Sequence, residues 1–287
     1  MVKLDALTSR VVTDTTTQRT SRSSTLSGIL IEEGVVAVES GSSLEMGHSF
    51  RKGLENHFNL PVVRLFLTHT HSDHRNGMMA FSDSILTLSS KCLGNMPSSV
   101  RLGRWKVETF EQELKLGEKS QVEFFHVGGH TVGSSVTYIP EDRVLIGGDL
   151  IFERSVNFGL PVLVFYQNKP KRDGNPEEYI TAFKLFKRMK IDIIVPGHGN
   201  LIRDAQRHLT EQIKFFEDLR TFILAEISEG KGVEEITLPQ LDPISQAYSD
   251  LNRYENHSAA KRWLLSYLDK LKKSFYIYYS THPSIQQ

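Results

Sequence analysis

The first half of the chain alternates short apolar runs with turn residues, a pattern that predicts strands around one helix. Segments 26–31 and 35–39 are apolar and flank Glu32-Glu33-Gly34, which predicts a hairpin with a glycine in its turn. Over residues 44–58 apolar side chains recur every four positions, the stripe of an amphipathic helix. The apolar run 62–67 reads as a buried strand. We therefore expect a strand-helix-strand unit in this region.

Beyond this unit the pattern changes from short strands to helices. It predicts a short helix at 77–81, strands at 84–88, 105–110, 121–127, 134–139, 143–147 and 191–195, and helices from 175, at 203–228, 243–251 and 257–272. The stretch 230–241 is the one plausible linker, since it contains Gly232 and Pro239. The segment after this linker is too small to fold alone. We therefore expect a main domain over residues 1–205 and a helical C-terminal extension over 206–287 packed on it.

Composition narrows the class of protein. Lys and Arg total 34, as do Asp and Glu, so the net charge is zero and no global positive field attracts nucleic acid. The single cysteine, Cys92, excludes an intrachain disulfide and a cysteine metal cluster, which favours a reducing, cytoplasmic setting. Met1–Arg22 lacks an apolar stretch of signal-peptide length, and nowhere do 18 apolar residues follow one another. We expect a protein that is neither exported nor membrane-spanning.

The segment His69-Thr70-His71-Ser72-Asp73-His74 places four potential metal ligands directly after the predicted strand 62–67. Imidazole nitrogens and carboxylate oxygens are donors that zinc prefers. Because side chains alternate in an extended segment, His69 and His71 point the same way, and the turn that follows directs Asp73 and His74 toward a second position. The alternative is a polar surface loop rich in histidine. The density of ligands favours a metal centre, and one short loop could serve two ions.

Three more candidate ligands follow glycines at the ends of predicted strands. These are His130 after Gly128-Gly129, Asp149 after Gly147-Gly148, and His198 after Gly197. Glycine lets the backbone turn sharply and approach an ion, while a rigid strand fixes the donor. Each site alone could be a plain turn or a hydrogen-bonded loop histidine. Their joint occurrence downstream of the histidine segment favours a shared metal centre.

Together these residues resemble the metallo-β-lactamase superfamily, whose pattern is HxHxDH, then a distant histidine, an aspartate and a final histidine. The resemblance covers about residues 24–205. It implies the α+β class and an αββα sandwich, with two sheets face to face, helices outside and the metal site at one edge. By the same resemblance, one metal would be held by His69, His71 and His130, the other by Asp73, His74 and His198, and Asp149 would bridge them. Two zinc ions are the expected cofactors, with iron or manganese as alternatives.

Two short segments near the motif depart from the family pattern. Glu39-Ser40-Gly41 stands where many members carry Asp-Thr-Gly, and Arg75-Asn76-Gly77 replaces a commoner glycine-rich continuation. Glu39 is the candidate to support a metal-bound imidazole, a role that depends on the reach and angle of its longer side chain. Neither departure changes the seven candidate ligands.

The implied chemistry is attack by hydroxide. Two cations about 3.5–4 Å apart share a water and lower its pKa toward neutrality, so a bridging hydroxide is the expected nucleophile. Asp149 and Asp73 are the candidate catalytic residues: Asp149 would fix the separation of the ions, and Asp73, with His74, would anchor the second ion and orient the hydroxide. Cys92 has no glycine turn or neighbouring histidine, so we interpret it as uninvolved. The other histidines are interpreted as structural or exposed: His48, His57, His126, His208, His257 and His282.

Features that could select a substrate lie after Asp149. The apolar run 158–166 is either a pocket wall, with Tyr166 as a hydrogen-bond donor, or a buried segment packed on the sheet. The basic side chains that follow could receive an anionic group, although a solvated loop is the plainer interpretation; they are Lys169, Lys171 and Arg172. The C-terminal helices resemble lids of thioesterase-type members similar to glyoxalase II. The alternative is that the C-terminal aromatic residues line a homodimer contact; they are Phe275, Tyr276, Tyr278 and Tyr279.

We therefore expect a dinuclear metal-dependent hydrolase of a small ester, thioester or lactone. A phosphodiesterase or nuclease of the same superfamily is the first alternative, but it would predict a basic groove or a clamp domain. An iron-dependent dioxygenase of sulfur substrates is a second alternative, and a flavin-partnered oxidoreductase is disfavoured because no flavodoxin-like segment is visible. A binding protein with an inert site would be expected to lose a ligand, whereas all seven candidates are present.

Overall fold

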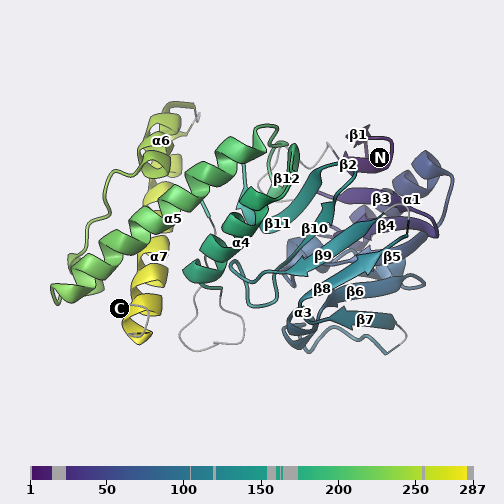
Figure 1. The fold of residues 1–287 in the computed structure, drawn as a ribbon, viewed down its shortest axis with the longest axis horizontal. Helices are drawn as coiled ribbons and strands as arrows, with labels where there is room; N and C mark the ends of the chain where they lie inside the picture. Colours follow the sequence, from purple (N-terminus) through teal and green to yellow (C-terminus); the bar gives the residue numbers. More distant parts are fainter. Residues whose placement is uncertain are drawn as a thin grey trace.

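Two β-sheets lie face to face with helices on their outer faces (Figure 1). The computed structural model describes residues 2–14, 24–103, 105–118, 121–153, 160–161, 163, 174–253 and 256–282. The α+β class and the αββα sandwich expected from the sequence are confirmed.

The first sheet has the order β1-β2-β3-β4-β5-β6-β7. Its strands are β1 (Leu4–Ala6), β2 (Val11–Asp14), β3 (Ser27–Ile31), β4 (Gly34–Val38), β5 (Val62–Phe66), β6 (Ile85–Ser89) and β7 (Lys106–Phe110). Strands β1 to β4 pair antiparallel, and β4 to β7 pair parallel. The outer face is covered by α1 (Leu44–Phe58), η1 (Met78–Phe81) and α3 (Ser90–Gly94). Helix α1 begins after Ser43, whose side chain accepts a hydrogen bond from the Met46 amide.

The second sheet has the order β12-β11-β10-β9-β8. Its strands are β8 (Glu113–Leu116), β9 (Val122–His126), β10 (Ser135–Ile139), β11 (Val144–Phe152) and β12 (Ile193–His198). The pairs are antiparallel except β11 with β12, which run parallel. A parallel pair needs a crossover connection, and it includes α4 (Pro176–Arg188), which packs on the outer face of this sheet.

The central strands β4, β10 and β11 are buried on both faces. In β4, Val35 and Ala37 join the cluster under α1, whereas Val36 and Val38 join the cluster between the sheets. This is the alternation expected of a strand whose successive side chains point to opposite faces. The cluster between the sheets includes Phe66 and Phe124, whose ring centroids are 4.4 Å apart. The edge of this sandwich is therefore a rigid platform for the segments that follow the strands.

The C-terminal helices pack beside α4, where α5 and α7 run next to each other (Figure 1). These elements are α5 (Ala205–Ser228), η4 (Val233–Glu235), α6 (Asp242–Asp250), η5 (Leu251–Arg253) and α7 (His257–Thr281). Phe216 of α5 stacks on Tyr179 of α4 at 4.7 Å and contacts Phe275 of α7 at 5.7 Å. One apolar cluster therefore continues from the second sheet into the extension. The domain division at residue 205 stays a prediction.

Several sequence expectations need correction. The short strands β1, β2 and β8 and the helix α3 were not predicted, because three to five residues carry too little periodicity to be recognised. Helix α7 continues to Thr281, past its predicted end at 272. Of the four side chains expected in a dimer contact, Phe275, Tyr278 and Tyr279 are buried within the chain itself, and Tyr276 is partly buried.

Among the described residues, no helix combines the length and the apolarity needed to cross a bilayer.

Candidate metal centre

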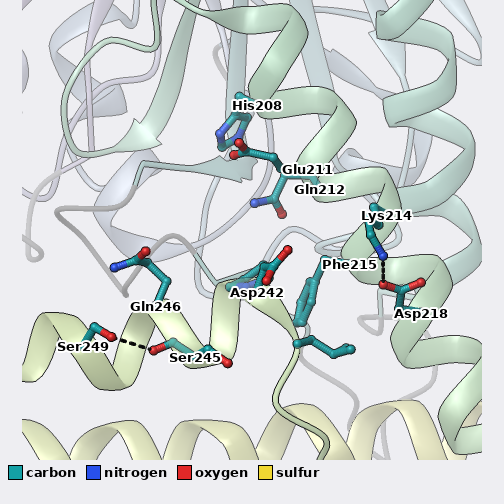
Figure 2. A pocket seen from close by; sticks show the side chains of 12 residues that line it. His208, Glu211, Gln212, Lys214, Phe215, Asp218, Asp242, Ser245, Gln246 and Ser249 are labelled. Carbon is teal, nitrogen blue, oxygen red and sulfur yellow. Dashed lines mark hydrogen bonds and ion pairs between the residues drawn. The ribbon is translucent and has the colours of Figure 1, made fainter.

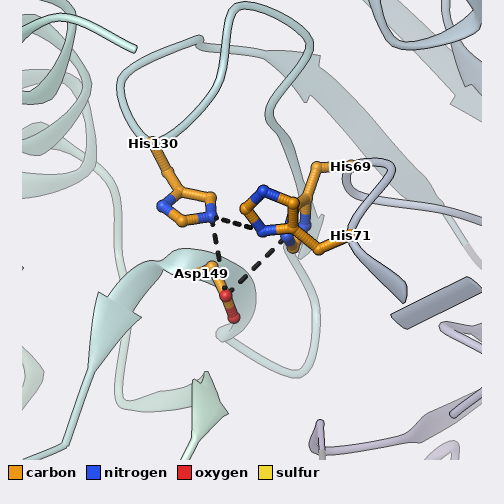
Figure 3. Close-up of side chains that lie close together, drawn as sticks. All are labelled: His69, His71, His130 and Asp149. Atoms are coloured by element: carbon orange, nitrogen blue, oxygen red, sulfur yellow. Dashed lines mark hydrogen bonds and ion pairs between the residues drawn. The ribbon is translucent and has the colours of Figure 1, made fainter. Parts of the chain in front are cut away.

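The seven predicted residues meet at one edge of the sandwich. His69, His71, Asp73 and His74 follow β5, where a four-residue helix, α2 (Ser72–Arg75), turns the last two back toward the sheet. His130 lies in the loop between β9 and β10, Asp149 lies in β11, and His198 is the last residue of β12. Figure 3 shows four of them, His69, His71, His130 and Asp149, pointing toward one another. Residues far apart in the sequence thus converge on one small volume.

Asp149 lies between two groups of histidines. Its Oδ2 atom is 3.7 Å from His69 Nε2 and 3.6 Å from His130 Nε2. Its Oδ1 atom is 3.0 Å from His74 Nε2 and 3.3 Å from His198 Nε2. The two carboxylate oxygens therefore face different pairs of imidazoles.

Each group is completed by one more donor. On the Oδ2 side, Nδ1 of His71 is 3.1 Å from Nε2 of His130, and the donor atoms of His69, His71, His130 and Asp149 all lie within 4.8 Å of one another. On the Oδ1 side, Oδ2 of Asp73 is 3.2 Å from His198 Nε2 and 3.6 Å from His74 Nε2. The arrangement offers two adjacent positions that share Asp149.

Thr68 and Glu39 orient the first histidine of the segment. The Thr68 hydroxyl donates a hydrogen bond to Glu39 Oε1 and lies 2.9 Å from His69 Nδ1. Because this hydroxyl has a single proton, and that proton goes to Glu39, His69 Nδ1 must be the donor in the second contact. The lone pair of His69 is then on Nε2, the nitrogen that faces Asp149.

Glu39 orients His74 in the same way. Its Oε1 atom is 3.3 Å from His74 Nδ1, so a proton on Nδ1 leaves the Nε2 lone pair facing Asp149 and Asp73. Glu39 follows the end of β4 and has a φ of +67°, in the left-handed region that non-glycine residues rarely adopt. The longer glutamate side chain therefore reaches the imidazole of His74.

The pKa values in this cluster reflect burial and its close charges. Burial alone would raise the pKa of Asp149, but the neighbouring His74 and His198 hold it well below its ordinary value. Burial alone would lower the pKa of His198, but Asp149 and Asp73 raise it to about 9. The pKa of His69 is lowered, first by burial and then by the charge of His74. Asp149 is therefore an anion, and the site attracts positive charge.

The donor set fits divalent cations. Three buried atoms that face the cluster make no hydrogen bond within the described part of the chain: His69 Nε2, His74 Nε2 and Asp149 Oδ1. A buried polar atom without a partner costs about 1–3 kcal/mol, and more when it is charged. Imidazole and carboxylate are the ligands that zinc takes at about 2.0–2.2 Å, so cations between these atoms would satisfy all three.

The two strands that carry Asp149 and His198 approach each other unusually closely. A Cβ atom on Gly197 would overlap the Oδ1 atom of Asp149, so only glycine fits there. The expectation that both donors follow the ends of strands is wrong, because β11 continues through Asp149 to Phe152 and β12 ends on His198 itself. The pairing of these strands shifts register on either side of Gly148, and this irregularity turns Asp149 toward the histidines.

Three supporting residues were not found from the sequence as parts of the site. Thr68 directly precedes His69, a proximity that could have suggested its role. Phe152 is paired with His198 in the sheet, and its ring stacks on that imidazole with centroids 5.7 Å apart. Glu178 of α4 accepts a hydrogen bond from the Gly129 amide beside His130. No local pattern marks Glu178, because its contact depends on how α4 packs.

The remaining candidates lie outside the cluster. Cys92 is buried, and burial raises the pKa of its thiol, so it stays protonated. His48, His57, His257 and His282 are exposed, and His126 bonds the Val132 carbonyl. His208 lines a cavity of about 440 Å³ between α5 and α6 (Figure 2), where its Nε2 has no hydrogen-bond partner among the described residues.

Part of the predicted substrate region can be placed. In the apolar run 158–166, Leu160 and Leu163 are buried in the cluster shared with the C-terminal helices. The carbonyl of Pro161 accepts a hydrogen bond from the Tyr267 hydroxyl of α7. Tyr166, Lys169, Lys171 and Arg172 lie outside the described residues.

The chain belongs to the metallo-beta-lactamase superfamily, whose family model matches residues 22–198. The family resemblance inferred from the ligand pattern is therefore confirmed. The match begins after β2, covers the sandwich from β3 to β12, and ends at His198, before α5.

Individual relatives are distant. The chain is 26% identical to a metallo-beta-lactamase type 2 of Bacillus sp. (strain 170), over 59% of this chain and 64% of that protein. It is 23% identical to a beta-lactamase-like protein 2 homolog of Caenorhabditis elegans, over 67% of this chain and 59% of that protein. The chain thus spans under two thirds of the length of these curated relatives.

A solved structure shows the same fold. The metallo-beta-lactamase from Pontibacter korlensis matches with a TM-score of 0.60 at 21% identity, over 76% of this chain and all of that one. The DIM-1 metallo-beta-lactamase matches with a TM-score of 0.58 at 16% identity, over 76% of this chain and 97% of that one.

Proposed function

We propose that the protein is a hydrolase that uses two divalent cations, zinc in the first instance, to cleave a small ester, thioester or lactone. The observation that carries the proposal is the placement of Asp149, whose two carboxylate oxygens face separate pairs of histidines. A carboxylate in this position suits a ligand shared by two ions.

In this proposal, His69, His71 and His130 hold one ion, Asp73, His74 and His198 hold the other, and Asp149 contributes to both. A pair of bound cations supplies a water of lowered pKa and polarises the oxygen of the electrophile. The chain itself fixes the donors. Glu39 and Thr68 set the tautomers of His74 and His69, and the stacked ring of Phe152 limits rotation of His198.

Two observations support the substrate class. The net charge is zero, which gives no long-range attraction for a polyanion such as nucleic acid. Leu160 and Leu163, which follow β11 in the sequence, are buried in the same apolar cluster as residues of α5 and α7. The C-terminal extension therefore packs against residues that follow Asp149 and its strand. A cytoplasmic location and a homodimer stay predictions.

The test is metal analysis of the protein purified without added metal, followed by a substrate screen. The screen contains thioesters, lactones, carboxylic esters, phosphodiesters and a β-lactam, the last because relatives carry that name. We expect about two zinc ions per chain and turnover of a thioester, lactone or ester. One iron per chain without hydrolysis would favour the sulfur dioxygenase instead, and turnover of phosphodiesters alone would favour the nuclease class.

A further inference from the structure

The first turn of α4 packs against the loop that carries His130 and forms a hydrogen bond with it. This loop, residues 127–134, joins β9 to β10, and its backbone passes through Gly128 and Gly129 with φ values of +67° and +84°. The Gly129 amide donates a 2.8 Å hydrogen bond to Oε2 of Glu178, which lies 49 residues away in the sequence. Glu178 therefore holds the residue directly before His130.

The loop and the start of α4 approach so closely that Gly128 and Gly174 have no room for a side chain. A Cβ atom on Gly128 would overlap the carboxylate of Glu178, and one on Gly174, just before α4, would overlap the carbonyl oxygen of Gly129. The ring of Tyr179 packs against Gly129 from the same helix turn. The loop is thus confined by α4 on more than one side, and the hydrogen bond from Gly129 sets its position.

Glu178 is itself held in place. Its own amide donates a 2.8 Å hydrogen bond to Oδ1 of Asn175, the residue that caps α4, and Pro176 follows that cap. A carboxylate in the first turn of a helix is stabilised by the helix dipole. The cap therefore fixes the backbone that carries the acceptor for Gly129.

We infer that Glu178 is a positioning residue for His130, and through it for one of the two cation positions. This inference rests on the proposed function. His130 Nε2 lies 3.1 Å from His71 Nδ1 and 3.6 Å from Asp149 Oδ2, so a displaced loop removes one donor from the group of His69, His71 and Asp149. Asp73 and His74 lie in α2 and His198 ends β12, so the other group is carried by different segments and we expect its ion to be retained.

Two substitutions separate the hydrogen bond from the charge. Glu178→Asp keeps the charge but shortens the side chain, and Glu178→Gln keeps the length and an acceptor oxygen but removes the charge. We expect Glu178→Asp and Glu178→Ala to bind about one ion per chain by elemental analysis, and Glu178→Gln to bind two. In the first two variants kcat falls about 10–100-fold while KM changes less than about threefold.

A second experiment measures the solvent protection of the loop in the metal-free protein. In the metal-free protein, hydrogen–deuterium exchange of a peptide covering residues 127–134 is expected to rise in Glu178→Ala and to match the wild type in Glu178→Gln. This readout does not depend on metal binding or on activity. If Glu178→Ala is too unstable for kinetics, the exchange of the loop is measured in Glu178→Asp and Glu178→Gln, which are milder changes. The contact is therefore tested in either case.

The matched control is Glu177→Ala. Glu177 is the neighbouring carboxylate in the same helix turn, but it accepts hydrogen bonds from Tyr279 and Arg220 of the C-terminal helices instead of the loop. We expect this variant to lose thermal stability and to keep two ions. The inference is overturned if Glu178→Asp and Glu178→Ala both keep two ions and wild-type exchange, or if Glu178→Gln loses an ion as readily as they do. A wild-type protein that binds no cation would overturn the proposed function instead.

Discussion

The Nε2 atom of His74 lies 3.0 Å from Oδ1 of Asp149, and both atoms are buried. Glu39 Oε1 lies 3.3 Å from His74 Nδ1 and favours a proton there, so a neutral His74 would turn its lone pair toward the Asp149 carboxylate. Two acceptors at this distance repel each other unless positive charge lies near them. Burial alone would lower the pKa of His74, yet Asp149 and Glu39 raise it well above its ordinary value. Protonation of His74 is one way to supply the positive charge that these two atoms need. A bound cation is the other.

Replacing Asp149 tests its shared role. Asp149→Asn keeps the shape of the side chain but removes the charge that faces both groups of histidines. We expect kcat/KM to fall about 1000-fold or more, because the electrostatic contribution of bound cations is worth several kcal/mol. His71→Ala should behave similarly while leaving the fold intact. Circular dichroism checks the fold, and activity that survives either change would contradict the assignment.

Removal of metal is expected to lower stability. Ions that bind only the folded chain stabilise it by about 4 kcal/mol each at a thousand times their Kd. For a chain of this size, 1 kcal/mol shifts Tm by about 2–4 °C, so a chelator should lower Tm by about 10 °C or more. Thermal melts with and without chelator, and after zinc is restored, measure this. An unchanged Tm would mean that the cluster holds no ion.

Gly197 offers a test of close approach. Gly197→Ala places a methyl group against the Asp149 carboxylate, so we expect a loss of about 1–3 kcal/mol in the free energy of unfolding, together with lower metal content. Gly94→Ala is the control, since a Cβ atom there meets nothing within 4 Å and the residue is helical. Urea unfolding and elemental analysis compare the two. Equal effects in both variants would show that the tight contact has no special importance.

His208 makes stability depend on pH. Burial lowers its pKa from 6.5 to about 4. Between these values the unfolded chain takes up a proton that the folded chain does not, so stability falls as the pH drops from 6.5 toward 4, by up to about 1.4 kcal/mol per pH unit. His208→Gln removes this contribution. Urea unfolding at pH 7 and pH 5 should show a smaller loss in the variant, and identical losses would contradict the prediction.

The parts of the fold that follow a clear period were predictable. Helix α1 has apolar residues every four positions, and the structure places its ends at the predicted Leu44 and Phe58. Strand β8 alternates Glu113, Leu114, Lys115 and Leu116, but four residues are too few to stand out from a loop. Its pairing with β9, a tertiary interaction, is what makes it a strand.

The candidate site also has parts that the sequence could predict and parts that depend on tertiary contacts. Its seven main residues could be named because ligand types recur at characteristic spacings in one segment and after glycines. The irregular pairing of β11 around Gly148 could not be predicted, because it depends on the register with β12. Glu178 was missed for a related reason, since only the packing of α4 on the loop of Gly129 gives it a role.

Strand β12, which ends on His198, is the last strand in the sequence, and this position has a consequence for biosynthesis. The ribosome makes the whole first sheet, and then Asp149, before it reaches His198 at the end of β12. Under the proposed assignment, a nascent chain that has not yet released β12 lacks one donor of the second ion. Full metal loading therefore requires that β12 has left the ribosome, and it cannot direct the folding of a shorter nascent chain.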